Sequence, residues 1–287
     1  MSHPDAVDPV KVGMDFGTTG SAVAFTRKDF ANGEFGRGTE AETPGYTKLE
    51  KANINARLGD RILLMREPEA ALYYALWTNR ADFRPNDMIL VVDLGGGAVD
   101  MATIKIIQLG DMPQLEHICA MEGMMNGGTS VDRGLLELIN SRDVPFRDLP
   151  PAVKGPGSAF HTDFEVCKWD FTGVDGPDFE LQLRDQNDVP IQHVNGGIIL
   201  LSRADLRGLY NPVIDRAANL INKRRDASQA TKIVFVGGFA ASKYVQSRLR
   251  GAFEVPGKST VILPRKPRLA VAIGAAIYAQ LGEQPRN

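Results

Sequence analysis

The sequence contains few cysteines and histidines and no long apolar run. Its 287 residues include two cysteines, Cys119 and Cys167, and four histidines without metal-ligand spacing. Two distant thiols are more typical of buried, reduced side chains than of a disulfide framework, which predicts a cytoplasmic protein. The longest apolar stretch, residues 269–279, is too short to span a bilayer. Residues 1–9 lack the pattern of a signal or transit peptide.

A strong excess of charge is also absent. The 33 basic and 35 acidic residues leave a net charge of −2, which gives no electrostatic basis for binding nucleic acid or an anionic membrane. Hydrophobic residues make up 43% of the chain, enough for a packed core, and this excludes an intrinsically disordered chain. The length fits one large domain or two packed lobes.

Two glycine turns form the most informative pattern. Residues 15–20 read Asp-Phe-Gly-Thr-Thr-Gly and residues 93–98 read Asp-Leu-Gly-Gly-Gly-Ala, and each turn lies between two β-type runs. Successive backbone N–H groups in such a turn make a seat for phosphate oxygens, whereas an ordinary hairpin turn is the alternative interpretation. The candidate phosphate ligands are Gly17, Thr18, Thr19, Gly95, Gly96 and Gly97.

A carboxylate stands at the start of each turn. Asp15 and Asp93 can each hold a water of a Mg²⁺ shell, because Mg²⁺ keeps several waters and takes few carboxylates directly. Glu67 precedes Pro68 at a predicted helix start. There it either orients water or Mg²⁺, or stabilises the helix through its dipole.

The order of strands and helices indicates an α/β protein. Strands are predicted over residues 11–15, 21–26, 61–65, 88–93, 99–108, 115–120, 179–183, 197–201, 232–236 and 261–263. Helices are predicted over residues 67–78, 131–141, 164–170, 206–223, 242–250 and 268–281. Residues 28–55 show no sustained period, and residues 142–163, rich in Pro and Gly, predict a surface connection.

Two shorter signals complete this pattern. Ser202 and Asp205 have the spacing of a capping box at the start of the long helix. Gly237 and Gly238 follow a compact strand and would let a base or ribose approach the backbone closely. A tight turn from strand to helix is the alternative explanation for this glycine pair.

Taken in order, these pieces resemble the actin-like ATPase superfamily, specifically the ATPase domain of the heat-shock protein 70 family. The similar segments are two phosphate motifs, two connecting motifs and an adenosine motif, at residues 12–24, 90–100, 66–76, 267–279 and 233–245. The Gly-Gly-Phe form of the adenosine turn is most similar to the divergent branch that lacks the peptide-binding domain. The end of the chain after the second connecting motif agrees with that expectation.

The resemblance implies a two-lobed, ribonuclease H-like α/β fold with a nucleotide cleft between the lobes. Lobe I would comprise residues 1–86 plus 265–287, and lobe II residues 87–264. Lobe I is expected to be truncated, because the stretch between Asp15 and Glu67 is too short for the family's further strands. This stretch also offers no lysine that matches the family's catalytic lysine.

The resemblance also implies ATP or ADP and Mg²⁺ as ligands. Asp15 and Asp93 would hold the water shell of Mg²⁺, with Asp93 and Glu67 near the attacking water. Three further pairs have implied nucleotide contacts: Gly127 and Gly128 to phosphate, Glu165 and Lys168 to the ribose and base, and Gly237 and Gly238 to the adenosine.

The predicted function is therefore MgATP binding with slow hydrolysis coupled to lobe closure, related to chaperones, with clients or co-chaperones as partners. Ala98 stands where the family usually has a threonine that touches the γ-phosphate. A nucleotide-binding or protein-interaction module without turnover is accordingly the alternative. A small-molecule kinase of the same superfamily is a third hypothesis, for which the shortened lobe I leaves little room.

Overall fold

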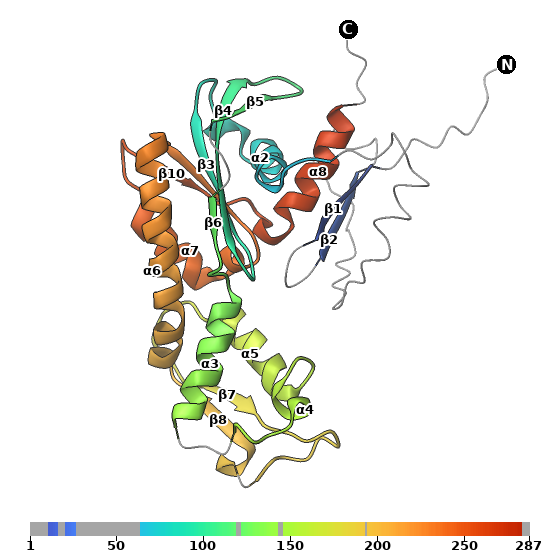
Figure 1. Cartoon of the computed structure of the whole chain (residues 1–287), viewed down its shortest axis with the longest axis vertical. Helices are drawn as coiled ribbons and strands as arrows, with labels where there is room; N and C mark the ends of the chain where they lie inside the picture. The colour runs from blue at the N-terminus through green and yellow to red at the C-terminus, as the bar shows by residue number, and fades with distance from the viewer. Residues whose placement is uncertain are drawn as a thin grey trace, which may run out of the picture.

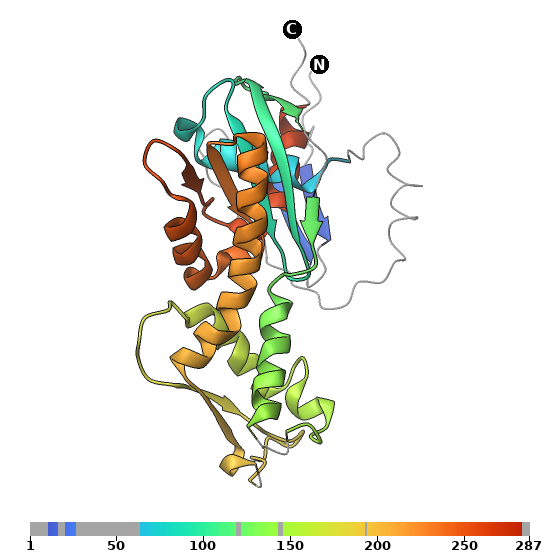
Figure 2. The same cartoon turned by 60° about the vertical axis from the view of Figure 1, so that its left-hand side comes forward.

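The computed structural model describes residues 11–16, 21–26, 64–118, 122–142, 146–192 and 194–282. The described elements form two parts (Figures 1 and 2). The sheet part is built around a six-stranded sheet, and the helical part contains the helices and the two-stranded hairpin between residues 129 and 201. Helix α6 (Arg203–Ser228) extends along both parts. The turn between β3 (Met88–Leu94) and β4 (Val99–Gln108) lies where the two parts meet.

The sheet is mixed, with β3 (Met88–Leu94) at its centre. The strand order is β10-β9-β3-β4-β5, and β6 also pairs with β4. The β3–β9 and β9–β10 pairs are parallel, whereas the pairs of β4 with β3, β5 and β6 are antiparallel. The bounds are β4 (Val99–Gln108), β5 (Gln114–His117), β6 (Glu122–Met124), β9 (Lys232–Val236) and β10 (Thr260–Ile262). This mixed sheet with its helices confirms the predicted α/β class.

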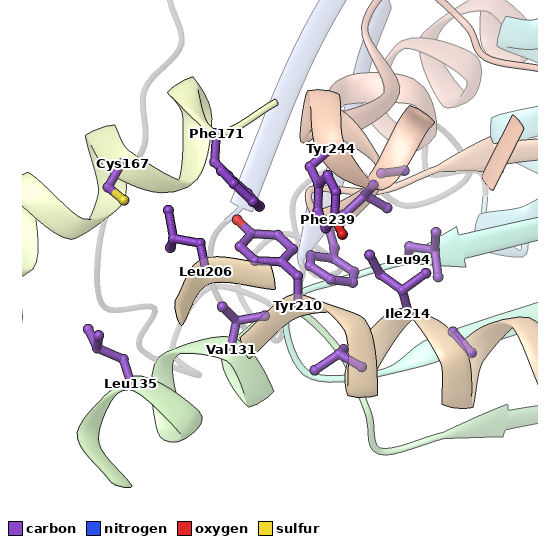
Figure 3. Packing of buried hydrophobic residues seen from close by; sticks show 14 of the residues in the cluster. Leu94, Val131, Leu135, Cys167, Phe171, Leu206, Tyr210, Ile214, Phe239 and Tyr244 are labelled. Atoms are coloured by element: carbon purple, nitrogen blue, oxygen red, sulfur yellow. The ribbon is translucent and has the colours of Figure 1, made fainter. Parts of the chain in front are cut away.

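Helices cover both faces of the sheet: α2 (Glu67–Thr78) and α8 (Ala270–Leu281) lie on one, α6 and α7 (Lys243–Phe253) on the other. Alternate residues of a strand point to opposite faces. Ile89 and Val91 therefore pack with α2 and α8, while Leu90 and Val92 point to the opposite face and belong to the hydrophobic core that includes α6 and α7, part of which Figure 3 shows. Asp93 continues the alternation of Ile89 and Val91, so it lies on the face that also carries the start of α2.

The helical part contains α3 (Thr129–Ser141), α4 (Pro151–Lys154), α5 (Ala159–Asp170) and the antiparallel strands β7 (Phe179–Gln182) and β8 (Ile198–Leu201). The predicted capping box starts α6, because the Asp205 N–H donates to the Ser202 hydroxyl and the Ser202 N–H donates to the Asp205 carboxylate. Short 3₁₀ segments are η3 (Arg80–Asp82), η4 (Asn195–Gly197), η5 (Phe239–Ala241) and η6 (Pro267–Leu269).

The antiparallel hairpin β1 (Lys11–Phe16)–β2 (Ser21–Thr26) packs against α8 (Figure 1). A Cβ atom at Gly13 would lie 1.9 Å from the Ala272 carbonyl oxygen, and one at Gly274 would lie 1.7 Å from the Ala70 carbonyl oxygen. Glycine at both positions lets α8 contact the backbone of the hairpin and the backbone of α2 at once.

Most predicted elements are confirmed, and the differences have physical reasons. The predicted surface connection over residues 142–163 is wrong in part, because α4 and the first turn of α5 lie within it and Phe146, Val153 and Phe160 are buried. The prediction treats proline as a helix breaker, but Pro151 lies in the first turn of α4, a position that tolerates proline. Leu64 and Met65 are not in a strand, and β6 was not predicted.

Several predictions lie outside the described residues. They include the loop over residues 28–55, residues 61–63 of the predicted strand 61–65, the turn residues Gly17, Thr18 and Thr19, and Cys119. Cys167 is buried and unpaired, as expected for a reduced thiol. The division of the chain into two lobes, with a truncated lobe I, stays a prediction.

Candidate functional site

The turn that joins β3 to β4 presents two unused backbone donors. The Gly95 N–H donates to the Ala98 carbonyl at 2.9 Å, which closes the turn. Over the described part of the chain, the N–H groups of Gly96 and Gly97 have no hydrogen-bond partner, and neither residue is fully buried. Adjacent free N–H groups of this kind suit an anionic oxygen.

A second turn, at the start of α3, donates three hydrogen bonds to the carbonyl groups of the β3–β4 turn. The Gly127 N–H donates to the Gly97 carbonyl at 3.1 Å, the Gly128 N–H to the Gly95 carbonyl at 3.0 Å, and the Thr129 N–H to the Gly96 carbonyl at 2.8 Å. A Cβ atom at Gly127 would lie 2.3 Å from the Gly96 oxygen, so only glycine fits. Gly127 and Gly128 thus use these N–H groups to orient the β3–β4 turn, and their predicted contact with phosphate stays a prediction.

Four carboxylates gather next to this turn. Asp93 and Asp100 are opposite each other in the β3–β4 register. Burial raises the pKa of Asp93 to about 7, and the charges of Glu67, Asp15 and Asp100 add to the effect. Burial also raises the pKa of Asp100, while desolvation and the Asp100 charge raise that of Glu67. The cluster therefore favours the binding of a proton or a cation.

The strand ends explain why these groups meet. Asp15 lies near the end of β1, Glu67 is the first residue of α2, and Asp93 and Asp100 flank the β3–β4 turn. The three predicted carboxylates Asp15, Glu67 and Asp93 are thus brought together. The site residue that the sequence reasoning missed is Asp100, and the symmetrical position of residues 93 and 100 about the turn is the signal that could have found it.

The double-glycine turn after β9 borders the same cluster. Gly237 has φ +95°, and a Cβ atom there would lie 2.2 Å from Asp93 Oδ1 and 2.5 Å from the Leu94 carbonyl oxygen. Its N–H donates to the Pro267 carbonyl at 2.9 Å, which ties the turn to η6. Gly238 has ordinary helical dihedrals and open space where its Cβ atom would be, so a ligand could approach its backbone.

Glu165 and Lys168 lie one turn apart on α5 and bind each other. Lys168 Nζ is 2.5 Å from Glu165 Oε1 and 2.7 Å from Asp132 Oδ1 on α3. The i,i+3 spacing predicts the first pair, but the partner on α3 follows only from the packing of the two helices. The role of this pair toward a ribose or base stays a prediction.

The first glycine turn, with Gly17, Thr18 and Thr19, lies outside the described residues. Within those residues, no three side chains among His, Cys, Asp and Glu are placed to hold a metal ion directly. No helix in the described ranges is long and apolar enough to cross a membrane. The carboxylate cluster fits a hydrated Mg²⁺, because a dication would oppose both the burial and the carboxylate repulsion that raise the pKa of Asp93.

Comparison with known proteins shows distant similarity to chaperones of the heat-shock protein 70 family. The chain is 26% identical over 199 residues to "Chaperone protein DnaK" of Thermoplasma volcanium, a match that covers 67% of this chain and 31% of that protein. It is 24% identical over 244 residues to "Chaperone protein HscA" of Buchnera aphidicola subsp. Baizongia pistaciae, which covers 81% of this chain and 40% of that protein. The chain thus spans less than half the length of these relatives.

No protein-family model matches the chain. The similarity to the two chaperones supports, at the level of the family, the resemblance inferred from the order of the motifs.

Proposed function

We propose that the chain binds MgATP where the β3–β4 turn, the carboxylate cluster and the double-glycine turn meet, and that it hydrolyses ATP slowly. The observation that carries the proposal is the convergence of two free N–H groups, at Gly96 and Gly97, with the raised pKa of Asp93 beside them. Donors for an anion next to an excess of carboxylates suit a polyphosphate together with its cation.

Each described group then has a role. The Gly96 and Gly97 N–H groups would donate to phosphate oxygens, and Asp15 and Asp93 would hold Mg²⁺ through its waters. Mg²⁺ supplies charge neutralisation on the phosphate oxygens when bound. Gly238 would let the adenosine approach the backbone of the double-glycine turn.

Asp93 and Glu67 would position the attacking water. Burial and the neighbouring carboxylates raise the pKa of Asp93, and a dication nearby would oppose both effects. The carboxylate form would then prevail and accept a hydrogen bond from water. Glu67 lies at the exposed start of α2, on the solvent side of the cluster. Catalysis of this kind rests on positioning and charge stabilisation, with closure of the lobes as the coupled motion.

A module that binds nucleotide without turnover is the second candidate, and Ala98 favours it. This residue ends the β3–β4 turn and has a methyl group where a hydroxyl would be needed to contact phosphate. The relation to chaperones, the presence of clients or co-chaperones and a cytoplasmic location are parts of the same proposal, because the chain spans only part of the chaperones it resembles.

Two measurements test the proposal. A thermal melt with MgATP should show a raised midpoint, by about 2.7 kcal/mol of stabilisation at a hundredfold excess over Kd, and MgGTP serves as the comparison. Phosphate release by the wild type should exceed that of Asp93→Asn. Equal release by both would contradict hydrolysis, and a melt unchanged by MgATP would contradict nucleotide binding.

Ala98→Thr separates the two candidates further. If the missing hydroxyl limits turnover, this variant should release phosphate faster than the wild type while binding MgATP equally well. Ala98→Ser, which restores the hydroxyl without the methyl group, and Ala98→Val, which has the branched shape without the hydroxyl, are the matched controls.

A further inference from the structure

A pocket of about 520 Å³ lies between the start of α2, the end of β5 and the last turn of α8 (Figure 1). The residues that line it are Leu64, Met65, Arg66, Glu69, His117 and Tyr278. Pockets that hold small molecules have volumes of about 300–1,000 Å³ and combine apolar walls with a few polar groups. None of these residues belongs to the candidate nucleotide site, so the pocket needs an explanation of its own.

The cation of the pocket is Arg66, the residue directly before α2. Its side chain is exposed and does not cap the helix. Within the described ranges this guanidinium makes no hydrogen bond and no ion pair, even with Glu69 three positions later. An arginine fork without a partner at the edge of a pocket is suited to a ligand carboxylate.

The anion of the pocket is Glu69, which His117 orients. His117 Nε2 lies 3.3 Å from Glu69 Oε2, and among the described residues the buried Nδ1 has no hydrogen-bond partner. A neutral ring that donates from Nε2 uses its one proton for Glu69 and leaves Nδ1 as an acceptor. The ring in this form fixes the carboxylate without adding a charge, so the negative charge of Glu69 remains for a ligand.

The apolar lining is partly rigid and partly open to water. The ring of Tyr278 meets that of Tyr73 edge to face, with centroids 5.1 Å apart, and the Tyr73 hydroxyl donates to the Pro113 carbonyl at 3.1 Å. Leu64 is 90% exposed. An apolar group placed between such side chains would remove their exposed surface from water.

An ordinary solvated surface is the alternative explanation, and it accounts for Arg66 or for Glu69 taken singly. It gives no reason for an unpaired charge of each sign beside exposed apolar surface around one hollow. A ligand that is only an anion would be repelled by Glu69, and one that is only a cation would leave Arg66 unused. The lining therefore suits a ligand that carries both charges and an apolar group.

We infer that this pocket binds a small zwitterion of the class of free α-amino acids with a large apolar side chain. The ligand carboxylate pairs with Arg66 and its ammonium group with Glu69. The ligand side chain packs against Leu64, Met65 and the Tyr278 ring. The inference goes beyond the proposed function and does not rest on it, because no residue of the carboxylate cluster or of the glycine turns lines the pocket.

The probe for the test is L-phenylalanine, titrated into the complete chain. A ligand of this size in an open pocket should bind with a Kd of about 1 mM, which saturation-transfer NMR on the ligand protons can measure. Two analogues each lack one charge: 3-phenylpropanoate has no ammonium group and 2-phenylethylamine has no carboxylate. Each should bind the wild type about tenfold more weakly.

Two variants then show which protein charge meets which ligand charge. Arg66→Gln should weaken L-phenylalanine binding about tenfold and leave 2-phenylethylamine binding unchanged. Glu69→Gln, which keeps an acceptor for His117, should weaken L-phenylalanine binding about tenfold and leave 3-phenylpropanoate binding no weaker. Arg133→Gln, at an exposed arginine of α3, is the matched control and should bind all three ligands like the wild type.

This crossed dependence on ligand charge and protein charge is the result that supports the inference. If L-phenylalanine does not bind the wild type at concentrations well above the expected Kd, the inference is wrong. If Arg66→Gln weakens 2-phenylethylamine as much as L-phenylalanine, Arg66 acts through the fold or the overall charge, and the assignment is overturned as well. None of these results bears on MgATP, whose melt and phosphate-release tests stand separately.

Discussion

Asp93 and Asp100 lie directly opposite each other across β3 and β4, on the face of the sheet that α2 and α8 cover. Like charges in this arrangement are destabilising, and Glu67 and Asp15 add two more carboxylates. These four carboxylates repel one another when no cation is bound, and a cation bound among them would remove this cost. The stability of the chain should therefore depend on pH in a particular direction.

The first prediction concerns Asp93→Asn. The pKa of Asp93 is about 7 in the folded chain and about 3.9 in an unfolded one. The folded chain therefore binds this proton more tightly than the unfolded chain does. The resulting contribution to the free energy of unfolding is fully present below about pH 4 and is lost as the pH rises through 7. Without Mg²⁺, Asp93→Asn should exceed the wild type in free energy of unfolding at pH 8 by about 1–2 kcal/mol, allowing for partial contact with solvent.

Urea denaturation from pH 5 to pH 8 measures this difference. The wild type should lose stability across that range, and Asp93→Asn should lose much less. Asp226→Asn, an exposed aspartate in the last turn of α6, serves as the control and should follow the wild type. A slope that is the same in Asp93→Asn and the wild type would show that the cluster does not determine the pH dependence.

The second prediction compares the two residues of the double-glycine turn. Gly237→Ala would place a Cβ atom 2.2 Å from Asp93 Oδ1 at a positive φ, so we expect a loss of about 2–4 kcal/mol in the free energy of unfolding. Gly238→Ala meets nothing within 4 Å and should change it by less than about 0.5 kcal/mol. Chemical denaturation of both variants gives the comparison, and equal losses would mean that the backbone of this turn adapts freely.

The third prediction concerns the contact of α8 with α2. Gly274→Ala would bring a Cβ atom to 1.7 Å from the Ala70 carbonyl oxygen, so the two helices would have to separate, with a cost of about 2–4 kcal/mol. Gly251→Ala lies in α7 with open space around it and should stabilise the chain by about 0.5–1 kcal/mol, the usual gain of alanine over glycine in a helix. Thermal melts of the two variants should therefore shift in opposite directions, and a stabilised Gly274→Ala would contradict the close packing.

Local signals predicted most of the elements, and contacts between distant segments account for what was missed. The capping box at Ser202 and the start of α2 at Glu67 depend on neighbours in the sequence, so the residues alone were enough. Asp132 joins Lys168 only because α3 packs beside α5. The N–H groups of Gly127 and Gly128 turn toward the β3–β4 turn for the same reason, since the distance between these segments is not encoded in any local period.

The last prediction concerns Asn126, which connects the site to α6. Its side chain is buried, donates from Nδ2 to the Val213 carbonyl at 2.9 Å and accepts from Arg216 Nε at 2.9 Å. Asn126 directly precedes the Gly127 turn that orients the β3–β4 turn. Asn126→Ala should cost about 2–3 kcal/mol of stability through two lost buried hydrogen bonds, and it should also weaken MgATP binding at temperatures where the variant is fully folded.

Melting curves and MgATP titrations of Asn126→Ala give the two readouts, with the exposed Asn187→Ala as a control that should change neither. A loss of stability with unchanged MgATP affinity would show that the Gly127 turn keeps its place without Asn126. A loss of both would show that α6, which extends along the sheet part and the helical part, helps to set the geometry of the proposed phosphate donors at Gly96 and Gly97. In that case a motion of α6 would reach the proposed nucleotide site through this side chain as well as through the packing of α6 on α3 and β3.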